Sequence, residues 1–344
     1  MADEPRVTRA AREIEQPDSI DLDALIAADE PVVLRGAAAD WPLVTAGRRS
    51  PAAAAAYLQR FDGGRPVTGY VGQPSIKGRF HYDESGTGLN FAAQSFGLGT
   101  FLDRVLASAS EQTAPSLYLG STDLDVYLPG FRTENELRVG GDTFDRHPPL
   151  ASIWIGNRTI ASAHYDMSNN AAVCAVGRRR FTLFPPDQVA NLYPGPLAPT
   201  PGGQVVSMVD FRAPDLIRHP RFEEAVAAGR VADLEAGDVI VYPALWWHHV
   251  EALDDFNVLV NYWWNAAPMF MDTPMDTMLH ALLSIRDRPA QEKRAWRAMF
   301  DHYVFGDAAS VAAHLPEAAR GPLAPLDEAG ARQLRAYLLH RLNR

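Results

Sequence analysis

The segment AHYDMSNNAAVCAVGRRRFTLFPPDQ, residues 163–188, decides how this chain is expected to fold. It opens with His164-Tyr165-Asp166, continues as an apolar run up to Gly177, and passes through three arginines into a Pro-Pro turn. Side chains two positions apart on a β-strand point to the same face. The imidazole of His164 and the carboxylate of Asp166 are therefore expected to project together, as two parts of a metal site.

Short apolar segments separated by turn residues surround this stretch from residue 150 onward. They are ASIWIGN, AAVCAV, RRFTLF, QVVSMVDF, DVIVYP, HHVEAL and NVLVNYWW. Several short strands at such spacing favour a β-sandwich or jelly roll. Upstream, PVVLRG (31–36) and SLYLGS (116–121) are predicted strands, AAADWPLV (37–44) is a predicted loop, and PAAAAAYLQRF (51–61) is a predicted helix capped by Ser50.

The chain becomes helical after Ala267. MDTMLHALLSI, AQEKRAWRAMFDHYVF, DAASVAAHL and DEAGARQLRAYLLHRL all carry apolar residues at helical spacing. We therefore predict a mainly β domain over residues 1–267, with N-terminal decorations, and a C-terminal helical region over residues 268–344.

Composition narrows the class of protein. The 344 residues include 47% hydrophobic residues, enough for a sizeable core, and 42 acidic against 32 basic residues give a net charge of −10. This charge argues against a nucleic-acid binder that works through bulk charge. The single cysteine, Cys174, excludes an internal disulfide framework and a cysteine-rich zinc module. No secretory signal or membrane-length apolar run is present, so a cytoplasmic setting is expected.

A third metal ligand is expected from GDVIVYPALWWHHV, residues 237–250, which contains His248 and His249. Neighbouring residues on a strand face opposite ways, so only one of the two can join the site, and spacing alone does not choose between them. Two His and one carboxylate with open positions are typical of non-haem Fe(II) oxygenases. A lone His-x-Asp pattern is weak, and the second one here, His81 to Asp83, precedes a Gly-rich turn and is interpreted as non-ligating.

The three arginines at 178–180 suit a cosubstrate with a free carboxylate. Fe(II) oxygenases of this kind use 2-oxoglutarate, whose far carboxylate needs a buried cation, and arginine pairs with carboxylates bidentately. Strand alternation predicts that one arginine points inward, while the others form a solvated face. Asn170 shares the parity of His164 and is either a cosubstrate donor or a turn residue. Asn261, inside an apolar strand, needs a partner because burying an unpaired amide is costly; a cosubstrate carboxylate and the backbone are the alternatives.

Together, HYD…N…GRRRFTLFPPDQ…LYP, GD-x4-P-x2-WWHHVE and VNYWW resemble the JmjC-type, cupin-fold oxygenases that depend on Fe(II) and 2-oxoglutarate. Within that family, the sequence is similar to the asparaginyl hydroxylase that inhibits hypoxia-inducible factor. The resemblance extends from PVVLRGAAADWP to NYWW. It implies a double-stranded β-helix and iron bound by His164, Asp166 and His248, and it favours His248 over His249 as the third ligand.

The resemblance also assigns the cosubstrate site. It implies that Arg179 binds the far carboxylate of 2-oxoglutarate, with Tyr118, Asn170 and Asn261 as further contacts. It implies reaction with O2 to hydroxylate a substrate, and a homodimer formed through the C-terminal helices.

The sequence departs from the asparaginyl hydroxylase on the substrate side. Ala161 stands where that enzyme has a threonine, and Ser162 and Thr159 are the candidate replacements for its hydroxyl. Val205 and Val206 stand where it has a polar Arg-Gln pair that helps to hold the substrate. Asparaginyl hydroxylation is therefore not carried over. The tryptophan pairs WW at 246 and at 263 are interpreted as core and cavity wall.

We therefore expect an Fe(II)- and 2-oxoglutarate-dependent dioxygenase that hydroxylates a protein or peptide side chain or a small molecule. Loss of an N-methyl group from lysine is chemically open to the same machinery. The alternative is a non-catalytic cupin that binds a metal or ligand in a regulatory role, and a third hypothesis is a metal-dependent isomerase or hydrolase on the same fold. The buried distal cation discriminates, because only the oxygenase needs Arg179.

Overall fold

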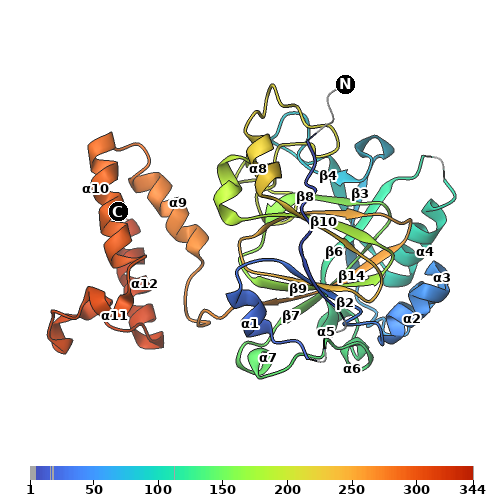
Figure 1. The fold of residues 1–344 in the computed structure, drawn as a ribbon, viewed down its shortest axis with the longest axis horizontal. Coiled ribbons are helices and arrows are strands. Elements are labelled where there is room, and N and C mark those ends of the chain that lie inside the picture. The colour runs from blue at the N-terminus through green and yellow to red at the C-terminus, as the bar shows by residue number, and fades with distance from the viewer. Residues whose placement is uncertain (1–4, 16, 18, 112, 344) are drawn as a thin grey trace. The chain divides into compact units, whose positions relative to one another are not determined.

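The computed structural model describes residues 5–15, 17, 19–111 and 113–343. The chain divides after Asn265 into two compact units (Figure 1). The strands of the first unit are β1 (Arg12–Glu15), β2 (Val32–Arg35), β3 (Val67–Gly72), β4 (Arg79–Phe80), β5 (Phe91–Phe96), β6 (Ser116–Asp123), β7 (Leu150–Gly156), β8 (Ile160–Tyr165), β9 (Asn169–Val176), β10 (Arg179–Phe184), β11 (Arg230–Leu234), β12 (Val239–Tyr242), β13 (Trp247–Ala252) and β14 (Asn257–Trp264). Its helices are α1 (Leu22–Ala27), α2 (Pro42–Arg49), α3 (Pro51–Gln59), α4 (Leu98–Ser108), α5 (Leu124–Tyr127), α6 (Phe131–Glu134), α7 (Thr143–Arg146) and α8 (Phe222–Ala228).

The strands of the first unit form two sheets. The nine-stranded sheet has the order β1-β2-β12-β9-β14-β7-β6-β3-β5, and the five-stranded sheet has the order β11-β10-β13-β8-β4. Neighbouring strands are antiparallel except for β1–β2 and β4–β8. This arrangement confirms the predicted cupin-type jelly roll with a helical extension.

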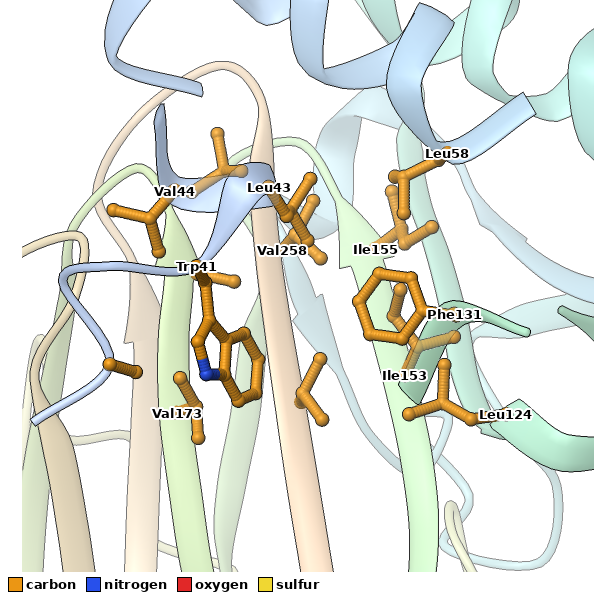
Figure 2. Close-up of a cluster of buried hydrophobic side chains, with 14 of the residues drawn as sticks. Trp41, Leu43, Val44, Leu58, Leu124, Phe131, Ile153, Ile155, Val173 and Val258 are labelled. Atoms are coloured by element: carbon orange, nitrogen blue, oxygen red, sulfur yellow. The ribbon is translucent and has the colours of Figure 1, made fainter. Parts of the chain in front are cut away.

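Helices α2, α3 and α4 cover the outer face of the nine-stranded sheet (Figures 1 and 2). Figure 2 shows Leu43 of α2 beside Val258, Leu58 of α3 beside Ile155, and Trp41, just before α2, beside Val173. Burying each such side chain contributes about 1.5–3 kcal/mol. This layer fixes the sheet whose other face forms one wall of the site.

Two sequence predictions in this unit are corrected. The segment predicted as a loop at 37–44 contains the start of α2, because Pro42 pre-sets the first helical turn. The predicted strand QVVSMVDF is wrong: within it the structure has only an isolated bridge between Pro194 and Ser207. Its valines are buried all the same, and an apolar run alone does not specify a strand. The predicted cap of α3 is confirmed, because the Ser50 hydroxyl accepts from the Ala53 N–H at 3.1 Å.

The second unit contains the helices α9 (Pro274–Ser284), α10 (Ala290–Tyr303), α11 (Ala308–Val311) and α12 (Glu328–Leu342). The ion pair between Arg335 and Asp272, 2.6 Å long, ties α12 to the segment before α9. In the part of the chain that the structure describes, no helix is both long enough and apolar enough to span a bilayer.

Candidate metal centre

The geometry of β8 and β13 brings together the three predicted metal ligands. The strands run antiparallel with His164 directly opposite His248, and Asp166 lies just past the end of β8. The candidate ligand atoms of the three residues all lie within 4.8 Å of one another. Two imidazoles and a carboxylate at this separation can hold one divalent ion and leave coordination positions open.

Backbone carbonyls orient both imidazoles. Nδ1 of His164 lies 2.8 Å from the carbonyl oxygen of Ser162, and Nδ1 of His248 lies 3.1 Å from that of Trp246. A proton on each Nδ1 satisfies these bonds and leaves the lone pair of Nε2 for a metal. Burial, followed by the neighbouring His164, lowers the pKa of His248 to about 4. His248 is therefore neutral at pH 7, the form that binds metal.

The structure separates His248 from His249. His248 and Val250 face the space between the sheets, whereas His249 stacks on Phe211 at 4.4 Å between ring centroids. Nε2 of His249 lies 3.6 Å from the Glu251 carboxylate. Strand alternation thus leaves His249 outside the cavity, on the far side of β13 from the group formed with Asp166.

A hydrogen-bond network supports Asp166 from β14. The indole N–H of Trp263 donates to Oδ2 of Asp166 at 3.0 Å and to Oδ1 of Asn170 at 2.6 Å. Asn261 donates to the same Asn170 oxygen at 3.0 Å, and Asn170 donates to the Ser168 carbonyl at 2.8 Å. The structure therefore places Asn170 in the network behind the carboxylate. This function of Trp263 was not predicted from the sequence, although its position two residues after Asn261 puts both side chains on one face of the strand.

A cavity of about 380 Å³ opens from the metal group between the sheets, and Arg179 lines it. The side chain of Arg179 is 2% exposed, and among the described residues its Nε and Nη2 atoms have no hydrogen-bond partner. Burial lowers the pKa of this guanidinium. Its neighbours point outward: Arg178 pairs with Asp254 at 2.8 Å and Arg180 with Asp233 at 2.7 Å. One arginine of the run thus faces inward, as alternation predicts.

The cavity fits a dicarboxylate that also reaches the metal. A buried cation without a partner is costly, and a carboxylate would satisfy it. Tyr118 lines the same cavity, and burial raises the pKa of its phenol to about 12, so it remains a hydrogen-bond donor at pH 7. Asn261 lines it too, but its amide nitrogen donates to Asn170 and its oxygen, unpartnered among the described residues, is an acceptor, so Arg179 and Tyr118 are the groups that can donate to a carboxylate. The chemistry of this donor set therefore suits 2-oxoglutarate.

A β-bulge between β8 and β13 decides which small residues face the cavity. His248 pairs with His164, but Val250 pairs with Ala161, so one extra residue lies on β8. Both Ala161 and Ser162 then line the cavity, and the buried Ser162 hydroxyl has no partner among the described residues. Of the two candidate hydroxyls, Ser162 reaches the cavity wall, whereas Thr159 is buried and is not part of the wall.

The second His-x-Asp pattern lies apart from the metal group. Nε2 of His81 is 3.0 Å from the carbonyl oxygen of Ser207. The Asp83 carboxylate accepts from the N–H and hydroxyl of Ser85 in an exposed turn. Over the described ranges, the group around Asp166 is the one in which three such side chains approach metal-binding distance.

The sequence is similar to a known domain family and to parts of several known proteins. The cupin-like domain family matches residues 17–270. Aligned segments are 33% identical over 127 residues to "Lysine-specific demethylase JMJ31" of Arabidopsis thaliana, covering 36% of this chain and 23% of that protein. They are 32% identical over 156 residues to "HSPB1-associated protein 1" of Homo sapiens, covering 44% and 31%. They are 35% identical over 144 residues to "tRNA wybutosine-synthesizing protein 5" of Mus musculus, covering 42% and 39%. The chain thus spans well under half the length of these relatives.

Proposed function

The chain belongs to the cupin-like domain family, and from this premise we propose that it is an Fe(II)- and 2-oxoglutarate-dependent dioxygenase that hydroxylates a protein or peptide side chain or a small molecule. One observation carries the proposal. A single cavity contains the His164, Asp166 and His248 group together with the buried guanidinium of Arg179, whose Nε and Nη2 have no hydrogen-bond partner in the described part of the chain. A cupin without a dicarboxylate cosubstrate has no use for such a cation.

The residues have separate roles in this proposal. His164, Asp166 and His248 would hold Fe(II), and Arg179 with Tyr118 would hold the far carboxylate of 2-oxoglutarate. Bound iron and 2-oxoglutarate supply the oxidation: overall, R–H, 2-oxoglutarate and O2 give R–OH, succinate and CO2, with one oxygen atom in the hydroxyl and the other in succinate. The protein supplies orientation and a water-poor site.

Orientation of the carboxylate ligand falls to Trp263. Its indole N–H donates to Oδ2 of Asp166 at 3.0 Å, the same oxygen that lies 3.6 Å from Nε2 of His248, and this bond fixes the plane of the carboxylate beside the two imidazoles. Such supporting contacts commonly change metal affinity or activity about 10–100-fold. Aromatic side chains along the cavity limit water near the reacting groups.

Succinate formation tests the proposal. Purified protein is given Fe(II), 2-oxoglutarate, ascorbate and air, beside the His164→Ala variant, and 2-oxoglutarate binding is measured in parallel. Succinate from the wild type but not from the variant supports the oxygenase. Tight binding of 2-oxoglutarate without turnover indicates that turnover requires the prime substrate. Absence of binding refutes the proposal and favours the non-catalytic cupin.

The names of the relatives leave the substrate open. One is named a lysine-specific demethylase, another an HSPB1-associated protein and a third a tRNA wybutosine-synthesizing protein. Each aligned segment covers a minor part of the relative. The proposal for this chain therefore stops at the reaction type, and hydroxylation is preferred to demethylation on the properties of the cavity.

The second unit supports a proposed homodimer. Of its described apolar side chains, only Val311, Ala312 and Ala331 are buried. Many others on its helices are exposed: Met278, Leu279, Leu283, Trp296, Met299, Tyr303, Leu334, Tyr337, Leu338, Leu339 and Leu342. An apolar surface of this kind usually has a partner, and we propose a second copy of the chain. Sedimentation should show a dimer that Leu339→Glu weakens and Arg332→Glu does not; a monomeric wild type refutes it.

A further inference from the structure

The cavity wall on the nine-stranded sheet is aromatic from the metal group outward. Five consecutive strands, β14-β7-β6-β3-β5, each contribute one ring to the same face. In strand order, the rings belong to Trp263, Trp154, Tyr118, Tyr70 and Phe91. The ring centroid of Trp154 lies 5.7 Å from that of Trp263 and 5.7 Å from that of Tyr118. The centroids of Tyr70 and Phe91 are 5.3 Å apart. Tyr70 lies opposite Tyr118 in the β3–β6 register.

This aromatic wall connects the reaction site to a free sheet edge. It begins at Trp263, which contacts Asp166, and ends at Phe91 on the edge strand β5. Phe80 from β4 closes the corner, 5.6 Å from Tyr118 and 5.1 Å from Phe91. A side chain entering past β5 therefore meets ring faces and edges along its whole path.

Glycine keeps this path open. A Cβ on Gly120 would lie 2.9 Å from the Trp154 ring, closer than side chains approach. The absence of a side chain at this position lets the Trp154 ring lie against the strand. The position of the Trp154 ring in the aromatic wall therefore depends on the glycine at position 120.

Charged groups in the cavity all belong to the cofactor site. The charged or imidazole side chains of the wall are Arg179, His164, Asp166 and His248. The rest of the wall consists of aromatic, aliphatic and neutral polar residues. An anionic substrate group placed along the aromatic wall would therefore lack a counter-charge, and burying an unpaired ion costs several kcal/mol, whereas a cationic group would be attracted by the ring faces alone.

A neutral loop forms the facing side of the cavity. Thr200, Pro201, Gly202, Gly203 and Gln204 line it. A Cβ on either of the two glycines, both of which are exposed, would meet no atom within 4 Å.

The base of this loop is held by the second His-x-Asp segment. The Tyr82 hydroxyl donates to the Pro196 carbonyl at 3.0 Å, and the His81 imidazole contacts the Ser207 carbonyl at 3.0 Å. The backbone N–H of Gly195 also donates to the Val206 carbonyl at 2.9 Å. The loop is therefore tied at both ends, so the slot between loop and aromatic wall is a formed part of the structure.

From this slot we infer that the group hydroxylated is an uncharged aromatic side chain of a protein or peptide, an inference that rests on the proposed oxygenase function. Aromatic pairs add about 0.5–1.5 kcal/mol beyond the area they bury, and the wall offers several such contacts. Methylated lysine is the competing occupant, because ring faces attract a cation even though the slot offers no free carboxylate beside them. A nucleobase is disfavoured because a chain of net charge −10 repels the phosphates beside it.

Ligand-observed NMR with small probes tests the inference. The full chain is examined alone, and again with Zn(II), which has no redox chemistry, and 2-oxoglutarate. The probes are p-cresol for an aromatic side chain, tetramethylammonium for a methylated lysine, propionate for an acidic side chain and 9-methyladenine for a base. The variants are Phe91→Ala, and Gln94→Ala as a control on the other face of β5.

We expect saturation transfer to p-cresol and a dissociation constant that Phe91→Ala raises about tenfold, in line with the loss of one ring contact. Gln94→Ala should leave it unchanged. If the alanine variant is misfolded by circular dichroism, Phe91→Leu keeps the bulk of the side chain and should still weaken binding. Equal or tighter binding of any other probe overturns the inference, as does p-cresol binding that is insensitive to residue 91. Because the readout needs no turnover, failed succinate formation with normal p-cresol binding would count against the oxygenase and not against the slot.

Discussion

Replacing Arg179 with methionine should have opposite effects on the stability of the ligand-free protein and on its affinity for 2-oxoglutarate. The side chain is 2% exposed, and two of its nitrogens have no partner among the residues that the structure describes. Methionine has a similar shape and no charge. The variant should bind 2-oxoglutarate poorly and yet unfold at a higher temperature than the wild type when neither protein holds a ligand.

The two effects have opposite signs for one reason. A buried charge that loses its partner costs about 3–5 kcal/mol. We therefore expect the dissociation constant of 2-oxoglutarate to rise about 10²- to 10³-fold, at about 1.4 kcal/mol per decade. Without ligand, apolar replacement of a poorly compensated buried ion stabilises by about 1–4 kcal/mol. Even about 1 kcal/mol should raise the melting temperature by roughly 2–4 °C for a domain near this size.

Thermal unfolding with and without 2-oxoglutarate measures both effects. Ligand at 100 times its dissociation constant stabilises the wild type by about 2.7 kcal/mol, and the variant should show almost no shift. Arg178→Met and Arg180→Met are matched controls, because these neighbours lie in exposed ion pairs, which contribute only about 0–1 kcal/mol. Either control should keep the wild-type response to 2-oxoglutarate.

Two results would refute the reasoning. If Arg179→Met binds 2-oxoglutarate within a few-fold of the wild type, the guanidinium does not anchor the far carboxylate. If the ligand-free variant is markedly less stable than the wild type, the side chain makes contacts that its unpartnered nitrogens do not reveal.

Three further predictions concern the metal site and its surroundings. Trp263→Phe should lower iron affinity about 10–100-fold by releasing Asp166, as judged by metal titration; unchanged affinity would remove its positioning role. His248→Ala should abolish stoichiometric iron binding in elemental analysis, whereas His249→Ala should retain it, and the reverse pattern would contradict the assigned ligand set. Burial lowers the pKa of His81, so below about pH 6.5 the unfolded chain takes up a proton that the folded chain refuses, and stability should fall as the pH falls. Urea unfolding at pH 7 and pH 5.5 should show this loss, and a His81→Asn variant with the same pH dependence would exclude this origin.

The alternation of side chains along β-strands was enough to predict a large part of the site. It placed His164 and Asp166 together, required that only one of His248 and His249 face inward, and required one arginine of the run to do the same. These outcomes follow from strand geometry alone. Alternation does not say which of His248 and His249, or which of the arginines at 178–180, points inward, because that depends on the register of the strand against its neighbours.

Features that arise from strand register or from irregular segments could not be predicted from the sequence. The bulge opposite Val250 shifts β8 by one residue, and no residue type announces it. QVVSMVDF is apolar enough to be a strand, but its valines pack as an irregular segment. Trp263 was interpreted only as cavity wall, because its bond to Asp166 joins segments far apart in the chain. Asn170 has the predicted parity, yet its amide is engaged by neighbours in the network.

The two sheets carry different parts of the site. His164, His248 and Arg179 lie on β8, β13 and β10 of the five-stranded sheet, whereas five of the rings along the slot lie on the nine-stranded sheet. Mutations on β3 and β5 can therefore alter what enters the slot while the chemistry on the opposite sheet stays constant. Such a division lets selection explore new targets one strand at a time without first losing the reaction, and it marks those two outer strands as the place to begin directed evolution.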